Sequence, residues 1–249
     1  MAFSATRMLM AAGFSGNTPP PFVVNAAFFD NASSALSVDC SALSNSTSGI
    51  LSVWVRFTAI GGGGANLFGL NITASAKMLL SVSGAGAVTL VLRNNSGNGY
   101  TISGATIGSG IWKNLLLSWQ TSTTTGTLTV NGSGTGSVSG FTGLSVPYAA
   151  NTPLVIGANP ASSTPVNGCI SEVYFAPGQF LDFTNSSNVA LFYSGSGHPV
   201  NLGSNGQAPT GTAPAVYWHG LYTDLTNLGS LGGSFTASGT ALTACASTP

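Results

Sequence analysis

Carboxylates are the first side chains to consider for chemistry, because a suitably spaced pair can hydrolyse a glycosidic bond. A retaining glycosidase needs two carboxyl groups about 5 Å apart, which on β-strands means acids at positions i and i+2 or on neighbouring strands. The chain of 249 residues has a single glutamate, Glu172, with no second acid near it in sequence. The four aspartates are scattered through predicted turns: Asp30, Asp39, Asp182 and Asp224. We therefore predict that the protein is not an enzyme.

Glu172 lies in the segment CISEVYFAPG, which the alternation of residues predicts to be a strand. A buried carboxylate needs a hydrogen-bonding partner. We expect that partner to be the backbone or an arginine such as Arg56 or Arg93. The alternative role for Glu172 is that of a calcium or sugar ligand.

Other reactive residue types give weaker patterns. Asp30-Asn31 is the best candidate for calcium, which needs several oxygens together, but an aspartate that caps a turn is a commoner explanation. His198 and His219 are far from any Ser–Asp pairing visible in sequence, so no catalytic triad is indicated. The glycine run 61–64 lacks a following Lys-Ser/Thr, which argues against a phosphate-binding loop. We predict no metal and no cofactor.

Binding of a sugar without a metal needs an exposed aromatic ring beside amide and hydroxyl groups. The candidate rings are those of Trp54, Tyr100, Trp112, Trp119, Tyr148 and Trp218. We expect most of them to fill the core. Trp112 and Tyr148 lie beside predicted turns, so these two form the predicted glycan platform.

The low charge of the chain limits its partners. Only 4% of the residues are charged, with five basic and five acidic side chains, whereas a typical soluble domain has about 25%. This argues against nucleic acid and anionic lipid, which attract clustered Lys and Arg. No run of 18 apolar residues could span a bilayer. A neutral surface gives little repulsion between copies, which favours a homo-oligomer or other assembly over the alternative of a secreted protein.

The three cysteines, Cys40, Cys169 and Cys245, cannot all pair within one chain. One disulfide with one thiol, or three buried thiols, fit the sequence equally well. Their spacing matches no zinc pattern.

Short segments of period two recur from residue 26 onward and predict a β-sandwich or jelly roll. In ILSVWVRFTAI (50–60) the residues of one face are apolar, and Trp54 on the other face indicates a strand that is covered on both sides. The segment 113–130 predicts two strands joined at TSTTTG, and Asn131-Gly132 after them is a hairpin signal. One short helix is expected near 186–193, with Thr184 or Asn185 as its N-cap.

The two ends of the chain differ from the middle. The N-terminal segment is predicted to be an apolar peg that docks onto another protein, and a Pro-rich spacer follows it. The apolar residues of the peg are Phe3, Met8, Leu9, Met10 and Phe14. The alternatives are a cleaved signal peptide and a frayed terminus. After residue 195, Pro and Gly recur, so we expect an extended arm in which AVYWHG could add one strand. The last 25 or so residues are expected to pack on a neighbouring copy or to fray. The predicted domains are 1–25, 26–183 and 184–249.

Six motifs in order resemble the concanavalin A-like, laminin-G-like jelly roll over roughly 26–180. They are FFDNASSALSV, SGILSVWVRFTA, LFGL, GIWKNLLLSWQTSTTTGTLTVNGS, PLVIGA and NGCISEVYFAPG. The resemblance implies an all-β, concanavalin A-like jelly-roll sandwich with one short helix and extended terminal arms. Hydrolases of this family carry an E-x-D-x-x-E-type strand, which the chain lacks.

The segment from 174 to 220 is similar to tails that follow this jelly roll in structural proteins of tailed bacteriophages and prophages. The match is to G-x-P-V-x-L-G-x-x-G-x-x-P-T-G-x-x-P at Gly197 to Pro214. This similarity implies a virion component (a fibre, spike or decoration protein) that is assembled in the host cytoplasm and contacts other virion proteins through its N-terminal segment. The alternative is a glycan-binding adhesin or lectin module that recognises the bacterial surface, either secreted or particle-borne.

Overall fold

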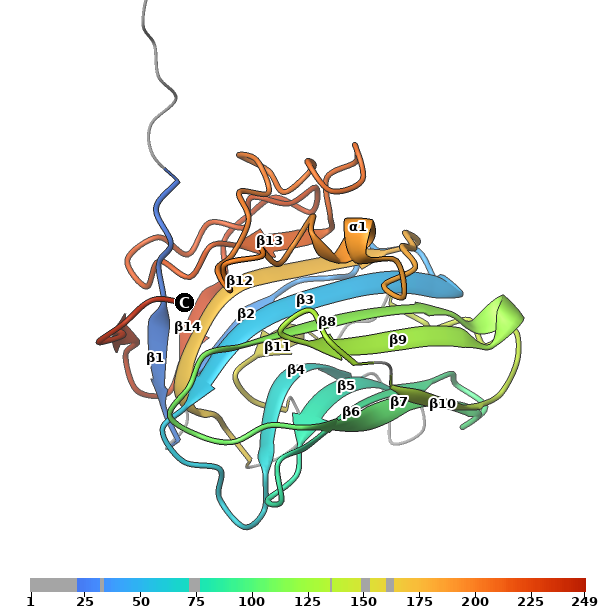
Figure 1. Cartoon of the computed structure of the whole chain (residues 1–249), viewed down its shortest axis with the longest axis horizontal. Helices are drawn as coiled ribbons and strands as arrows, with labels where there is room; N and C mark the ends of the chain where they lie inside the picture. The colour runs from blue at the N-terminus through green and yellow to red at the C-terminus, as the bar shows by residue number, and fades with distance from the viewer. Residues whose placement is uncertain (1–21, 32–33, 72–76, 135, 149–152, 160–163) are drawn as a thin grey trace, which may run out of the picture.

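The computed structural model describes residues 22–31, 34–71, 77–134, 136–148, 153–159 and 164–249. Two antiparallel sheets pack face to face (Figure 1), which confirms the predicted all-β jelly roll. Among the described residues, no helix is long and apolar enough to cross a membrane.

The first sheet has the order β15-β1-β12-β3-β8-β9, and β13 also pairs with β12. Its strands are β1 (Ala27–Asp30), β3 (Ser48–Phe57), β8 (Lys113–Gln120), β9 (Thr125–Val130), β12 (Asn167–Pro177), β13 (Val216–Trp218) and β15 (Thr243–Ala244). The 3-10 helix η1 (Thr121–Thr123) connects β8 to β9.

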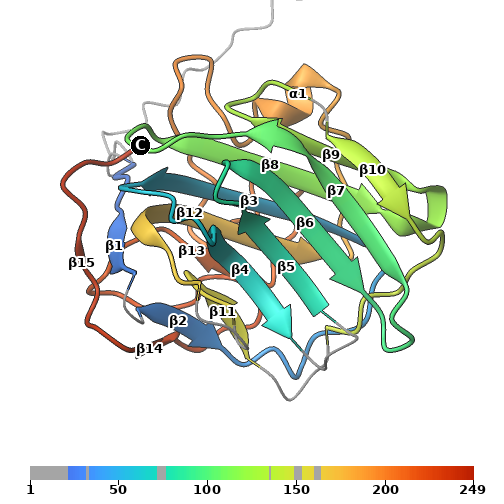
Figure 2. The same ribbon diagram turned by 90° about the horizontal axis from the view of Figure 1, so that it is seen from below.

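The second sheet has the order β10-β7-β6-β5-β4-β11-β2-β14. Its strands are β2 (Ala35–Val38), β4 (Ala65–Asn71), β5 (Lys77–Val82), β6 (Ala87–Arg93), β7 (Gly99–Thr106), β10 (Ser137–Gly140), β11 (Leu154–Ile156) and β14 (Thr236–Ser238). Figure 2 shows β4 to β7 side by side on the face of the molecule opposite the helix.

The main core lies between the sheets and follows the alternation in the sequence. On β3 the side chains of Leu51, Val53, Val55 and Phe57 are all buried there, as predicted. The Trp119 ring on β8 packs directly against the backbone of Gly49 on β3, where any side chain would collide with the ring. The packing of large rings against small residues is typical of a dense sandwich core.

A second apolar cluster covers the outer face of the first sheet. Ile50, Leu116 and Tyr174 on three strands pack against Phe183 and Phe192, which flank the helix α1 (Ser186–Val189) (Figure 1). The ring of Trp54 stacks on that of Tyr193 with centroids 5.7 Å apart. This confirms that β3 is covered on both faces. The helix begins after Asn185, whose side chain accepts a hydrogen bond from the Ser187 amide, as expected of an N-cap.

The end of the chain returns to the sandwich. Strand β13 pairs with β12, as predicted for AVYWHG. The prediction that the last residues pack on a neighbouring copy or fray is wrong, because β14 pairs with β2 and β15 pairs with β1 of the same chain. Both short strands add to an open sheet edge, which offers unpaired backbone groups to any segment that reaches it. A disulfide joins Cys169 to Cys245, while Cys40 is buried in the core.

Candidate functional site

The predicted docking peg lies outside the described residues: Phe3, Met8, Leu9, Met10 and Phe14 all belong to the first 21. The structure therefore gives no account of it.

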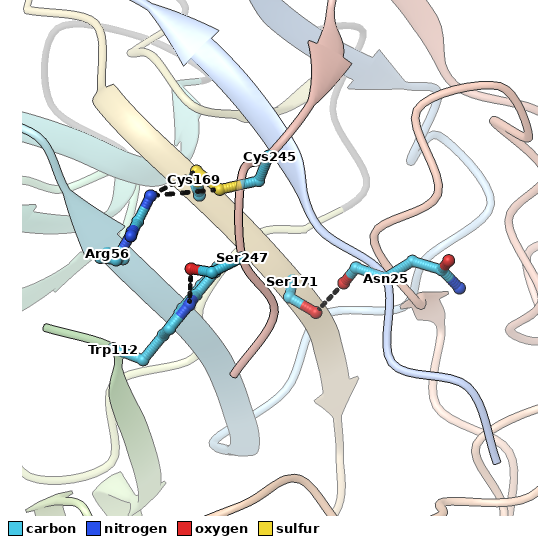
Figure 3. Close-up of a disulfide and its surroundings, with 7 residues drawn as sticks. All are labelled: Asn25, Arg56, Trp112, Cys169, Ser171, Cys245 and Ser247. Carbon is cyan, nitrogen blue, oxygen red and sulfur yellow. Dashed lines mark hydrogen bonds between the residues drawn. A yellow bond between two sulfur atoms is a disulfide. The ribbon is translucent and has the colours of Figure 1, made fainter.

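The predicted glycan platform is not formed as expected. Tyr148 has no exposed surface, and its ring packs edge-on against Phe175 with centroids 5.5 Å apart. The prediction that this ring is exposed is wrong, because the segment that includes Leu144 and Val146 runs into the core. Trp112 is partly buried, with its indole Nε1 donating a hydrogen bond to Ser247 Oγ at 3.2 Å (Figure 3).

A hollow of about 320 Å³ lies elsewhere, where three separate segments meet. Its lining comprises Phe22, Val23, Asn25, Asn201, Gly203, Ser204, Tyr217, His219 and Leu228. The Asn25 Nδ2 and His219 Nδ1 atoms are 3.4 Å apart. Aromatic, amide, imidazole and hydroxyl groups therefore converge on one concave surface, an arrangement typical of small-molecule sites.

The pairing of β12 explains how this hollow forms. Strand β1 pairs with residues 167–170 of β12, and β13 pairs with residues 173–175 along the same edge. The residues before β1 and after β13 consequently converge opposite Ser171, whose hydroxyl donates a hydrogen bond to the Asn25 carbonyl (Figure 3). Gly220 has a φ of +85°, and a Cβ there would lie 2.5 Å from the same carbonyl oxygen, so this approach requires glycine.

Glu172 lies at an irregular point of β12, beside the hollow. The register of β12 against β3 shifts between Ser171 and Tyr174, which indicates a bulge. Glu172 has a φ of +47°, a strained conformation for this residue type. Its side chain is only 2% exposed. Strained backbone and a buried carboxyl are features that cluster at functional sites.

The partner of Glu172 is a tyrosine, which corrects the expectation of an arginine or the backbone. Tyr217 donates a hydrogen bond from its hydroxyl to Glu172 Oε2 at 3.0 Å, and Oε1 has no partner among the described residues. Burial raises the pKa of Glu172 to about 7, although the hydrogen bond from Tyr217 opposes this. Burial and the nearby carboxylate raise the pKa of Tyr217 above its ordinary value.

Among the described residues, no charged side chain contributes to the lining of the hollow. The Glu172 carboxyl is connected to the lining through its hydrogen bond from Tyr217. Within the described part of the chain, no group of three or more His, Cys, Asp or Glu side chains could hold a metal ion. The arrangement can hold a small polar ligand by hydrogen bonds and by contact with rings.

Residues 30–179 match the family model of the concanavalin A-like lectin/glucanases superfamily. The chain belongs to this superfamily. Comparison with curated proteins finds no match. The walls of the hollow come from residues 22–25 and 201–228, so they lie outside the matched segment.

Solved structures share the fold at low sequence identity. A putative carbohydrate binding protein from Bacteroides ovatus is 14% identical with a TM-score of 0.65; the alignment covers 92% of this chain and 62% of that one. The K499G mutant of NanB sialidase from Streptococcus pneumoniae is 18% identical with a TM-score of 0.50, and the coverages are 66% and 27%. The native heptameric SAP-like pentraxin from Limulus polyphemus is 16% identical with a TM-score of 0.49, and the coverages are 67% and 81%. The first two likenesses show the jelly-roll fold.

No motif or periodicity in the sequence predicted the hollow. Its walls are separated by almost 200 positions: Asn25 precedes the six jelly-roll motifs, and His219 lies in AVYWHG, which predicted only a strand. The sequence showed only that His219 has no catalytic partner nearby, which does not indicate a binding site.

Proposed function

We propose that this protein is a carbohydrate-binding module and that a small saccharide occupies the hollow between residues 22–25, the loop 201–204 and Tyr217–His219. The observation that carries the proposal is the lining of that hollow, in which two aromatic rings lie beside two amides, an imidazole and a hydroxyl. Membership of the superfamily supports it.

Each part of the lining has a use in sugar binding. The side chains of Asn25, Asn201 and His219 offer hydrogen-bond donors and acceptors to sugar hydroxyls. The ring of Phe22 offers apolar surface to the C–H face of a sugar ring, while Tyr217 is buried and forms the base of the hollow. The described residues of the lining are all uncharged, which favours a neutral saccharide, since a buried anion would need a cationic partner.

The proposal is tested by applying the full chain to a glycan array and measuring the Kd of any hit by calorimetry. His219→Ala should weaken binding about tenfold, because one hydrogen bond lost from a formed site costs about 1–2 kcal/mol. His198→Ala is the matched control, since this exposed histidine does not contribute to the lining. A blank array with folded protein, or equal losses in the two variants, contradicts the proposal.

The role in a virion stays a prediction, which rests on the resemblance of Gly197 to Pro214 to segments that follow this jelly roll in structural proteins of tailed bacteriophages and prophages. A glycan-binding module could be displayed on a particle or secreted. Mass spectrometry of density-purified particles and of the cleared medium distinguishes the two: a virion component is found in the particles, and a secreted one in the medium.

A further inference from the structure

The disulfide between Cys169 and Cys245 has two unlike ends. Cys169 lies on β12, between β1 and β3 in the first sheet, and is 1% exposed. Cys245 follows β15 near the end of the chain and is partly exposed, with exposed residues on both sides of it. The Cα atoms are 6.0 Å apart. A thiol in solution can therefore approach one sulfur and not the other.

The segment that carries Cys245 has few other attachments. Strand β15 pairs with β1 through only two residues, and the Cys245 amide donates to the Ala26 carbonyl at 3.0 Å. Farther on, Ser247 accepts the hydrogen bond from Trp112. Segments with few buried contacts open at small free-energy cost. Breaking the disulfide would thus leave residues 243–249 held by a handful of exposed hydrogen bonds.

A cation lies beside both sulfurs (Figure 3). Arg56 Nη2 is 3.6 Å from Cys245 Sγ and 3.9 Å from Cys169 Sγ. The guanidinium also lies 6.0 Å from the centre of the Trp112 ring, which helps to fix it in place. None of these contacts is with a carboxylate, so the positive charge is available to a developing thiolate. A positive charge lowers the pKa of a thiol, and a thiol of lower pKa is the better leaving group in disulfide exchange.

We propose that Cys245 is a site of thiol–disulfide exchange at which the protein becomes covalently joined to a molecule that bears a thiol. The incoming thiolate attacks Cys245 Sγ and forms a new S–S bond. The bond to Cys169 breaks, and Cys169 leaves with the electron pair as a thiolate beside Arg56. One disulfide is replaced by another, so no oxidant or reductant is consumed.

The attacking thiol belongs to a molecule other than a second copy of this chain. The other cysteine of the chain, Cys40, is fully buried in the core, so a second folded copy does not present it. The attacking group is either a small thiol or the cysteine of a partner protein, and both share the chemistry of a thiolate.

The experiment uses the full oxidised chain, reacted with glutathione in one arm and with a protein carrying one exposed cysteine in the other. Intact-mass spectrometry follows the mixed disulfide, and peptide mapping locates it. We expect the adduct on Cys245 in native buffer. Arg56→Gln should slow its formation on the order of tenfold, by loss of the charge beside the leaving thiolate, and Arg56→Lys should restore most of the rate.

Arg93→Gln on β6 is the control for loss of an arginine elsewhere in the chain, and it should not change the rate of adduct formation. The unfolding midpoints of the Arg56 variants are measured and should equal that of the natural protein, so that folded proteins are compared. Reaction in both arms supports attachment of a partner protein, and reaction with glutathione alone assigns the site to small thiols. An adduct on Cys169, an unchanged rate in Arg56→Gln, or reaction only in denaturant overturns the proposal.

Discussion

Tyr217 donates a hydrogen bond to Glu172 across 3.0 Å, and this bond connects the lining of the hollow to the irregular part of β12. The two residues are brought together by the pairing of β13 with β12, in which Trp218 lies opposite Val173. A buried carboxyl with one satisfied oxygen is costly when ionised. The charge of Glu172 should therefore influence both the stability of the fold and the position of the Tyr217 ring.

The first prediction concerns pH. The pKa of Glu172 rises from 4.5 to about 7 on folding, so the folded state holds the proton more tightly than the unfolded state. This stabilisation is fully present below pH 4.5 and is lost as the pH rises through 7. Between pH 4.5 and 8 the loss should be on the order of 3 kcal/mol. Glu172→Gln removes it, so this variant should gain stability relative to the natural protein at pH 8.

Urea denaturation of both proteins at pH 5 and pH 8 checks this. The comparison between them cancels the contributions of Asp39 and Asp224, whose pKa values are lowered by hydrogen bonds from Ser41 and Thr226. A difference in unfolding free energy that does not change with pH would show that Glu172 does not titrate in this range.

The second prediction concerns the hydroxyl of Tyr217. Tyr217→Phe leaves both oxygens of Glu172 without a donor, which should cost about 1–3 kcal/mol of unfolding free energy. The cost should be larger at pH 8, where the carboxyl is charged. Tyr222→Phe is the control, because Tyr222 is 37% exposed. In a double-mutant cycle with Glu172→Gln, additive effects would argue against coupling between the two side chains.

The third prediction concerns the disulfide. Cys245→Ser releases a cross-link between residues 76 positions apart, and the loss of such a constraint on the unfolded chain typically costs about 2–4 kcal/mol. Hydrogen exchange should increase at residues 243–249. Reduction of the natural protein should lower its stability by a similar amount, while the variant should not respond to reductant. A variant as stable as the oxidised protein would show that the disulfide adds no net stability.

Local sequence patterns predicted much of the fold. The alternation of apolar residues and the residue types at helix caps both depend only on neighbours in sequence. The faces of β3, the burial of Trp54 and the N-cap at Asn185 are examples. Asn131 and Gly132 have positive φ, and the residues on either side of them, Val130 and Ser133, form an antiparallel bridge, as predicted for a tight hairpin turn. The pairing does not extend into a longer hairpin, because the next described strand, β10, pairs with β7 of the other sheet. A turn signal fixes the local backbone and leaves the partner strand undetermined.

The site could not be predicted in the same way. The bulge at Glu172 arises from a mismatch between β12 and β3, and its partner Tyr217 is 45 positions away. Tyr148 was expected at the surface because it follows a turn, yet tertiary packing places it under Phe175. Such contacts depend on which segments meet in space, and no periodicity in the sequence records that.

The last prediction concerns the layer that covers the first sheet. The ring of Tyr193 stacks on Trp54 at a centroid distance of 5.7 Å with the planes 15° apart. This contact fastens the segment after α1 to β3, whose Trp54 would otherwise be exposed. Tyr193→Ala should cost about 2–4 kcal/mol of unfolding free energy, through lost burial and lost ring contact.

Hydrogen exchange measured by mass spectrometry gives the more specific test of this contact. In Tyr193→Ala, exchange should increase over residues 183–203, which pack on the outer face, and should change little in β4 to β7, which belong to the other sheet. Tyr222→Ala is the matched control, and a surface substitution of this kind should change stability by less than about 0.5 kcal/mol. An increase spread over both sheets would mean that the covering layer and the sandwich unfold as one cooperative unit, since local opening confined to the layer requires that it be separable from the core.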